Sequence, residues 1–259
     1  MRVAYFDCFS GVSGDMTLGA LVDAGVDIAL LRQELAKLPV EAYRLEAHVV
    51  TRSGLRGTKV DVLVDEEQQP VRKYTDIVAM ITDSALAPEV RQDALNVFRR
   101  LGEAEAHLHN EPLEAIHFHE VGAVDSIVDV IGAIIGLHEL HVQQVMASPI
   151  NIGSGTVRTA HGVLPVPAPA TLELVKGCPT YAGEVRMEMT TPTGAAIVTT
   201  MADRYGALPF MRVEQIGYGA GRRDLPGHPN LLRLVVGELE DVPDAGATEH
   251  HHHHHDHHH

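Results

Sequence analysis

Strand-like and helix-like segments alternate from the start of the chain. The apolar run RVAYFD (2–7) predicts a buried strand, and residues 13–27 then carry apolar side chains at helical spacing after a Ser-Gly turn. A second helix is predicted over 28–38. Two strands follow over 43–50 and 58–64, and the alternation in the second is typical of a sheet with one solvated face. This order indicates an α/β fold.

The remaining segments continue the alternation. Helices are predicted over 75–84, 88–110, 121–140, 170–177 and 193–206, and strands around 145–153 and over 210–221 and 230–239. A proline-rich bend lies at 164–169, and no internal repeat is visible. We therefore expect one large α/β domain over 1–242, with a mixed sheet or sheets and flanking helices, built as one unit or as two closely packed lobes.

The C-terminal end has a different composition. An acidic segment with Pro and Gly leads into a histidine run, so we expect 243–259 to be a disordered tail. Six histidines follow Glu249, as in an expression tag. Asp256 and three more histidines come after them, which favours a native metal-gathering tail.

Composition and charge narrow the function. The formal net charge is −15 with histidine neutral, and this disfavours a nucleic-acid partner, because phosphate binding needs clustered Lys and Arg. An acidic chain with 18 histidines suits divalent cations instead. Only Cys8 and Cys178 are present, too few for a disulfide framework. The chain has neither a signal peptide nor a membrane-spanning stretch, so we expect a cytoplasmic protein, and a homo-oligomer is compatible with the sequence.

The stretch HFHEVGAVDSIVDV (117–130) carries the first candidate chemistry. In a strand, His117 and His119 point to one side, so with Asp125 they form a candidate metal site, and Glu120 or His119 is a candidate base. The alternative is a junction in which each histidine only hydrogen-bonds a carboxylate. Asp129 shares a helix face with Asp125 but is flanked by core residues, and a buried carboxylate needs a partner such as a cation.

Further candidate residues lie in a turn near residue 161 and in the loop after the first predicted strand. His161 stands at a proline-bounded turn, as a metal ligand or a simple turn residue. The loop after the first strand offers Ser10, Gly11, Ser13 and Gly14 for an anion, and Asp7 and Asp15 for a cation beside it. Helix capping by Ser13 and Asp15 is the alternative interpretation.

Two further loops complete the candidate site. Thr191 and Thr193 stand at a predicted helix start, and Arg222 and Arg223 follow a strand; all four are candidate phosphate contacts. The three small-residue loops suggest one shared pocket, although each could be an ordinary β-turn.

Five long motifs stand in order along residues 1–240: DCFSGVSGDMTLGALVDAG, HFHEVGAVDSIVDVIGA, SPINIGSGTVRTAHGVLPVPAPATLEL, EMTTPTGAAI and GYGAGRRDLPGHPNLLR. In this order and spacing they resemble the LarC family, which matures the nickel-pincer nucleotide cofactor. The resemblance implies insertion of Ni²⁺ into pyridinium-3,5-bisthiocarboxylic acid mononucleotide, with two Ni–S bonds and one Ni–C bond formed and CTP consumed with Mg²⁺ or Mn²⁺.

Family members continue into a C-terminal domain with the CTP site, so the chain resembles their N-terminal part. We therefore expect that domain as a partner in trans, and nickel-pincer-dependent enzymes as recipients of the product. Two other functions stay open. One is a nickel storage or delivery chaperone without chemistry, and the other is a nucleotide-dependent phosphotransferase.

Overall fold

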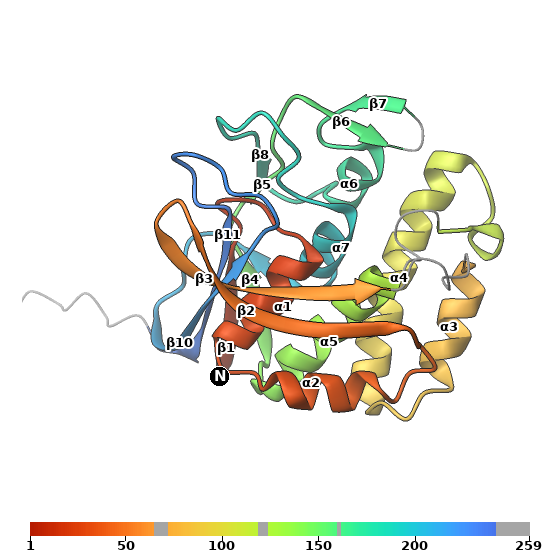
Figure 1. The fold of residues 1–259 in the computed structure, drawn as a ribbon, viewed down its shortest axis with the longest axis horizontal. Helices are drawn as coiled ribbons and strands as arrows, with labels where there is room; N and C mark the ends of the chain where they lie inside the picture. Colours follow the sequence, from red (N-terminus) through yellow and green to blue (C-terminus); the bar gives the residue numbers. More distant parts are fainter. Residues whose placement is uncertain (65–71, 119–123, 160–161, 242–259) are drawn as a thin grey trace, which may run out of the picture.

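A seven-stranded mixed sheet forms the centre of the protein (Figure 1). The computed structural model describes residues 1–64, 72–118, 124–159 and 162–241. From one edge to the other, the strands are β2 (Tyr43–Arg52), β3 (Leu55–Val64), β10 (Met211–Ala220), β11 (Leu231–Leu239), β1 (Arg2–Asp7), β4 (Gln144–Ala147) and β9 (Arg204–Tyr205). β1 is parallel to β4 and antiparallel to β11, and β10 is antiparallel to β11 and parallel to β3. The predicted α/β fold with a mixed sheet is confirmed.

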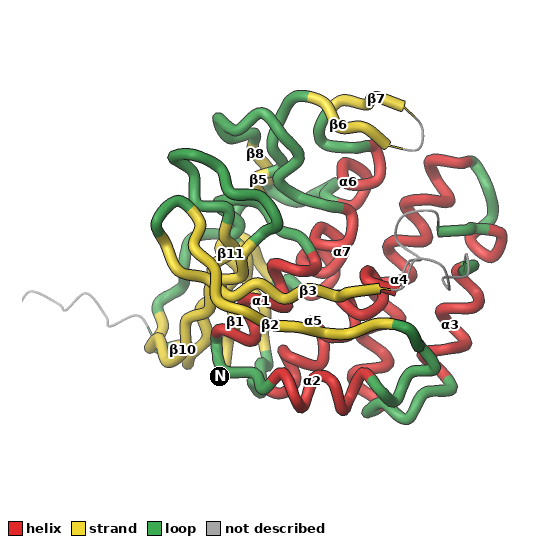
Figure 2. The backbone as a smooth tube through the Cα atoms, in the orientation of Figure 1, coloured by secondary structure: helices red, strands yellow, loops and turns green. Residues whose placement is uncertain are grey.

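Helices flank this sheet in the described part of the chain (Figure 2). They are α1 (Gly14–Asp23), α2 (Ile28–Leu35), α3 (Tyr74–Thr82), α4 (Pro88–His109), α5 (Val124–Glu139), α6 (Pro169–Leu174) and α7 (Pro192–Met201), with a short 3₁₀ turn at Leu113–Ala115. α1 lies between the sheet, at β3 and β10, and α5. None of the described helices has the length and apolar character needed to cross a bilayer.

Glycines in β10 let α1 lie directly on the sheet. A methyl group on Gly219 would come within 2.5 Å of the backbone nitrogen of Ala20 in α1, so a larger residue would push the helix away. Gly217 and Gly219 therefore serve helix packing, and they lie within the strand predicted over 210–221. The close contact brings the start of α1 next to Arg222 and Arg223, which follow β10.

The core between α1 and α5 is equally close-packed. Nearly all of α5 is buried, and its Gly132 lies against Leu18 of α1, where an added methyl group would be 2.8 Å from Cδ2 of the leucine. Small residues at such crossings let two helices approach closely and bury more apolar surface. This packing holds the first turn of α5 beside the first turn of α1.

Two small sheets lie beyond the main one. β5 (Ile150–Asn151) pairs with β8 (Thr180–Tyr181), and β6 (Thr156–Thr159) forms a hairpin with β7 (Gly162–Pro165). In Figure 1 both stand together with α6 at the top of the view, above α7 and the start of α1. Residues of β6 line one wall of a cavity between these small sheets and the start of α1.

Several predicted boundaries differ from the structure. The helices predicted over 13–27, 28–38 and 170–177 end earlier, at Asp23, Leu35 and Leu174. The helix predicted over 193–206 ends at Met201, because Asp203 bonds to β4 instead: its backbone N–H donates to the Val145 carbonyl at 2.8 Å and its carboxylate accepts from the Val145 N–H at 3.0 Å. The next residues, Arg204–Tyr205, form β9. The helix predicted from residue 121 is described from Val124, since 119–123 lie outside the described residues.

Candidate functional site

The loop between β1 and α1 is first of all a helix cap. Ser13 Oγ accepts from the Met16 N–H at 3.4 Å, and Asp15 Oδ1 accepts from the same N–H at 2.9 Å and from the Ser13 hydroxyl. Ser10 is buried and its hydroxyl bonds to His228 Nε2 at 2.9 Å, while Gly11 packs against Met189. Of the four anion contacts predicted here, Ser13 and Gly14 line the cleft.

A buried lysine faces this cap from β3. Lys59 Nζ lies 2.7 Å from Asp15 Oδ2 and 2.9 Å from Asp61 Oδ1. Burial disfavours the ammonium, but the two carboxylates outweigh that effect, and the pKa of Lys59 is raised above its usual value. Lys59 is not among the candidate residues predicted from the sequence, because its position in an alternating strand predicts a solvated face.

Asp129 of α5 lies at the bottom of the same site. Its Oδ1 atom is buried and has no hydrogen-bond partner among the described residues. Burial, together with the nearby Asp15 and Asp125, raises the pKa of Asp129 well above its usual value. A buried carboxylate without a donor is costly, so an unpaired one in a cleft indicates a functional role.

These side chains line a cavity of about 300 Å³, which we call the acidic compartment and define by Asp15, Lys59, Asp61, Asp125 and Asp129. Gly14, Ser126, Thr191 and Thr193 also line it. It is lined by four carboxyl groups, the Lys59 ammonium and the Arg222 guanidinium, and its walls come from α1, β3 and α5, from the start of α7 and from the segment after β10. The excess of negative charge makes it suited to a cation.

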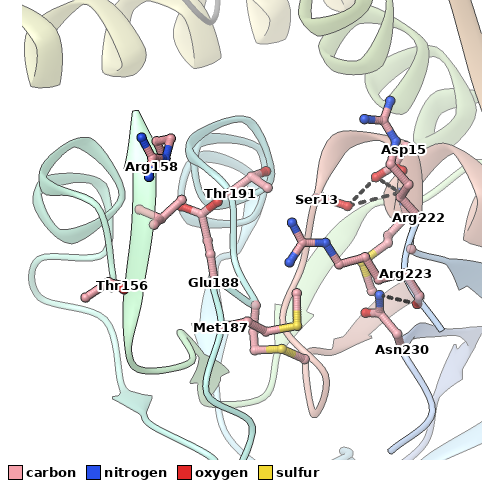
Figure 3. Close-up of a pocket in the computed structure, with 14 residues that line it drawn as sticks. Ser13, Asp15, Thr156, Arg158, Met187, Glu188, Thr191, Arg222, Arg223 and Asn230 are labelled. Atoms are coloured by element: carbon pink, nitrogen blue, oxygen red, sulfur yellow. Dashed lines mark hydrogen bonds between the residues drawn. The ribbon is translucent and has the colours of Figure 1, made fainter. Parts of the chain in front are cut away.

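A second cavity of about 480 Å³ adjoins the first and shares Ser13, Asp15, Thr191 and Arg222 with it. We call it the arginine compartment and define it by Arg158, Arg222 and Arg223. Figure 3 shows Arg158 on one wall, with Thr156 and Glu188, and Arg222 and Arg223 on the other, with Ser13, Asp15 and Asn230. No carboxylate of the described residues forms an ion pair with any of these three guanidiniums. Unpaired arginines around one cavity of an acidic protein indicate an anion site.

The start of α7 joins the two compartments. Thr191 caps this helix, since its Oγ1 accepts from the Gly194 N–H at 3.2 Å, and it lines both cavities. Thr193 Oγ1 lies 3.4 Å from Ser126 Oγ and lines the acidic compartment alone. The N-termini of α1 and α7 therefore both border the cleft, and their dipoles favour an anion between them.

The predicted metal ligands lie in different places. Asp7 forms an ion pair with Arg233 of β11, with Nε at 3.0 Å, and it does not line either compartment. His117 is exposed and bridges to Lys73, while the next residue, Phe118, is buried. The alternation of sides that the sequence predicted is therefore present at these two positions.

Asp15 and Asp125 both line the acidic compartment. His119, Glu120 and His161 lie outside the described residues. Among the side chains that the structure describes, no three of His, Cys, Asp and Glu gather as a set of metal ligands. The metal assignments to these residues therefore stay predictions.

The known proteins that this chain resembles are nickel insertion proteins. A family described as nickel insertion protein matches residues 4–258. The pyridinium-3,5-bisthiocarboxylic acid mononucleotide nickel insertion protein of Desulfitobacterium hafniense (strain DSM 10664 / DCB-2) is 55% identical over 241 residues, which cover 93% of this chain and 60% of that protein. The protein with the same description from Geobacillus kaustophilus (strain HTA426) is 48% identical over 255 residues, covering 95% and 62%. The chain thus spans about 60% of the length of these relatives. No solved structure matches it.

Proposed function

The chain belongs to the nickel insertion protein family, and we propose that it inserts nickel into pyridinium-3,5-bisthiocarboxylic acid mononucleotide. Nickel is then a substrate that is captured and handed on. The relatives whose printed names give this activity are longer than the matched region. We therefore propose that the complete, CTP-consuming reaction also uses the remaining part of the family's chain, where CTP and Mg²⁺ or Mn²⁺ would bind.

The observation that carries the proposal is the pairing of opposite charges along one cleft. Arg158, Arg222 and Arg223 surround the larger cavity, and four carboxylates surround the adjoining one. A guanidinium binds a phosphate through two parallel hydrogen bonds, so the arginine compartment suits the phosphate of a mononucleotide. Ser13 and Thr191, at the two helix starts, would contact the same ligand where the compartments meet.

The acidic compartment supports the nickel half of the reaction. Carboxylates bind Ni²⁺ more weakly than sulfur ligands hold it, so a carboxylate site can release the ion to the two thiocarboxylates of the nucleotide. Asp125 and Asp129 lie one helical turn apart on α5, with Asp15 opposite. Because no three such side chains gather as a ligand set among the described residues, we propose that single carboxylates of this group contact nickel in passing, with the sulfur atoms of the nucleotide as its further ligands.

Formation of the Ni–C bond releases the proton of the pyridinium C–H group, and that proton needs a base. Glu120 and His119, predicted for this role, precede α5 by a few residues in the sequence. The first turn of α5 carries Asp125. Both residues lie outside the described residues, and we keep Glu120 or His119 as the proposed base.

The test is direct detection of the product. The chain is incubated with Ni²⁺, the mononucleotide, CTP and Mg²⁺, with and without the remaining part of a family member, and the nucleotide is analysed by mass spectrometry. We expect a species that has gained nickel and lost protons. Nickel that stays on the protein with both parts present would indicate a storage role, and phosphate release without nickel would indicate phosphoryl transfer.

The product also defines the partners. A nickel-bearing nucleotide is a cofactor, so we propose that nickel-pincer-dependent enzymes receive it. Synthesis of a cofactor for such enzymes fits a cytoplasmic protein.

A further inference from the structure

Methionines are concentrated on one cavity of this protein. The chain has eight, and three of them, Met16, Met187 and Met189, line the arginine compartment. Met16 comes from the first turn of α1, on the wall that also carries Ser13 and Asp15. Met187 and Met189 come from the segment before α7, two residues apart, and flank Glu188. The cavity therefore has thioether side chains from two separate parts of the chain.

We propose that Met16, Met187 and Met189 receive the two sulfur-bearing groups of the substrate and set a preference for thiocarboxylates over carboxylates. This inference rests on the proposed function, because it assumes that the nucleotide lies in the arginine compartment. The chain's own residues supply the discrimination before nickel is bound.

The first support is the position of these side chains relative to the arginines. Figure 3 shows Met187 beside Glu188, on the wall of the cavity that faces Arg223 and Asn230. Met16 and Met189 are 2% and 5% exposed, so they form the floor, whereas Met187 is half-buried. A nucleotide whose phosphate is held by the arginines would place its pyridinium ring over this apolar floor.

The second support is the rigidity of the segment. Its backbone is held by the loop after β5, where the Ser154 N–H donates to the Met187 carbonyl at 3.2 Å and Gly153 forms a β-bridge with Glu188. An added methyl group on Gly153 would lie 2.9 Å from the Met189 nitrogen, so only glycine permits this approach. Because this backbone is already fixed, little conformational entropy is lost when the wall contacts a ligand.

The chemical reason is desolvation. A carboxylate is strongly hydrated and needs hydrogen-bond donors when it leaves water, and a thioether has no donor to offer. A thiocarboxylate carries part of its charge on a large, polarisable sulfur atom, which is less strongly hydrated and makes favourable contacts with methionine sulfur and methyl groups. With the arginines of the cavity engaged by the phosphate, the oxygen analogue therefore loses more than the sulfur compound when its carboxylates reach the methionines.

The experiment compares two mononucleotides that differ only in these atoms. Calorimetry without nickel measures the dissociation constants of the bisthiocarboxylic and the biscarboxylic pyridinium mononucleotide for the full chain, Met187→Gln and Met211→Gln. Both nucleotides carry the same phosphate, so the ratio of the two constants isolates the thioether contribution. Met211 begins β10, away from the cavity, and serves as the matched control.

We expect the unaltered chain and Met211→Gln to prefer the sulfur compound by about 10- to 100-fold, the range typical of apolar discrimination. Met187→Gln supplies an amide donor and should reduce the ratio several-fold while the melting temperature stays unchanged. Equal affinities in the unaltered chain, or an unchanged ratio in Met187→Gln, would overturn the inference and leave the proposed function standing. Binding of neither nucleotide would overturn both.

Discussion

Asp129 on α5 and Gly14 at the first position of α1 are in direct contact: a methyl group on Gly14 would lie 2.7 Å from Cγ of Asp129. The carboxylate thus rests on the N-terminal end of α1, where the helix dipole favours negative charge. Its Oδ1 atom nevertheless has no hydrogen-bond donor among the described residues. The fold therefore places a carboxylate at the meeting point of two helices without neutralising it through a donor.

The first prediction concerns this contact. Gly14→Ala should lower the free energy of unfolding by about 1–3 kcal/mol, because the new methyl group must displace the Asp129 carboxylate. Urea denaturation of Gly14→Ala, Asp129→Gly and the double variant measures the coupling. The double variant should be more stable than the sum of the single effects implies, because Asp129→Gly removes both the Cβ atom and the carboxylate that the new methyl group would meet. Gly206→Ala is the control, since position 206 has open space. Additive effects would mean that the two residues do not contact each other.

The second prediction concerns the charge of Asp129. Its pKa is raised above the ordinary value of 3.8, so between that pH and the raised pKa the native state holds more protons than the unfolded chain. Stability contributed by this group is therefore full below about pH 3.8 and falls as pH rises through the native pKa. Asp129→Asn removes this loss, and we expect the variant to be the more stable form at pH 8.

The measurement is urea denaturation of the chain and of Asp129→Asn at pH 4, 6 and 8. The stability difference in favour of the variant should grow with pH. A variant that is less stable at pH 8 would contradict the raised pKa and point to an unseen partner of the carboxylate. A variant that is more stable but fails in nickel insertion would show that the charge is kept for function.

The third prediction concerns the phosphate contacts. Arg222→Ala together with Arg223→Ala should weaken binding of the mononucleotide by about 1.5–3 kcal/mol, the usual range for hydrogen bonds to a charged group. Both arginines are exposed, so the loss should shrink as salt is added. Arg44→Ala is the matched control, because Arg44 is exposed on β2 and does not line the cleft. Unchanged affinity in the double variant would move the phosphate site elsewhere.

The fourth prediction concerns the HFH stretch in a chain that lacks residues 249–259, because we expect the histidines there to bind nickel independently of the folded part. If His117 and His119 are ligands, replacing both by alanine should remove the tight nickel site that remains. His117 is exposed, so the melting temperature should change little. Nickel calorimetry and thermal melts, with His107→Ala as the control, separate the outcomes, because His107 is exposed on α4 and lines neither compartment. Unchanged nickel affinity with a lower melting temperature would assign a structural role to the stretch.

The order of strands and helices was predictable, because the spacing of apolar residues that distinguishes a strand from a helix can be read from a short stretch of the chain. The buried strand over 2–7 and the capped helix after Ser13 follow from residues next to one another in the chain. The pairing of β10 with β3 was not predictable, since it joins segments far apart in the sequence through the close approach of α1. Helix ends that depend on such contacts, as at Asp203, were missed for the same reason.

The residues of the candidate site were likewise predictable where a local sequence pattern marked them, and not where only the fold brings them together. Ser13, Asp15, Thr191 and Arg222 were found from small-residue loops, and the structure brings all four to one cleft. Lys59 was missed, because nothing in an alternating strand shows that a lysine will be buried between two carboxylates. Arg158 and the three methionines of the arginine compartment were missed as well, since only the β6–β7 hairpin and the packing of the segment before α7 place them there.

We propose that one cleft holds the phosphate of the mononucleotide at its arginine end and nickel at its acidic end. The most direct measurement is a crystal structure of the chain shortened to residues 1–242, with nickel and the mononucleotide bound and with diffraction recorded at the nickel absorption edge. We predict an anomalous peak within coordination distance of Asp15, Asp125 or Asp129 and of the substrate's sulfur atoms, with the phosphate among Arg158, Arg222 and Arg223. A nucleotide bound outside this cleft, or a nickel peak away from these carboxylates, would contradict the account.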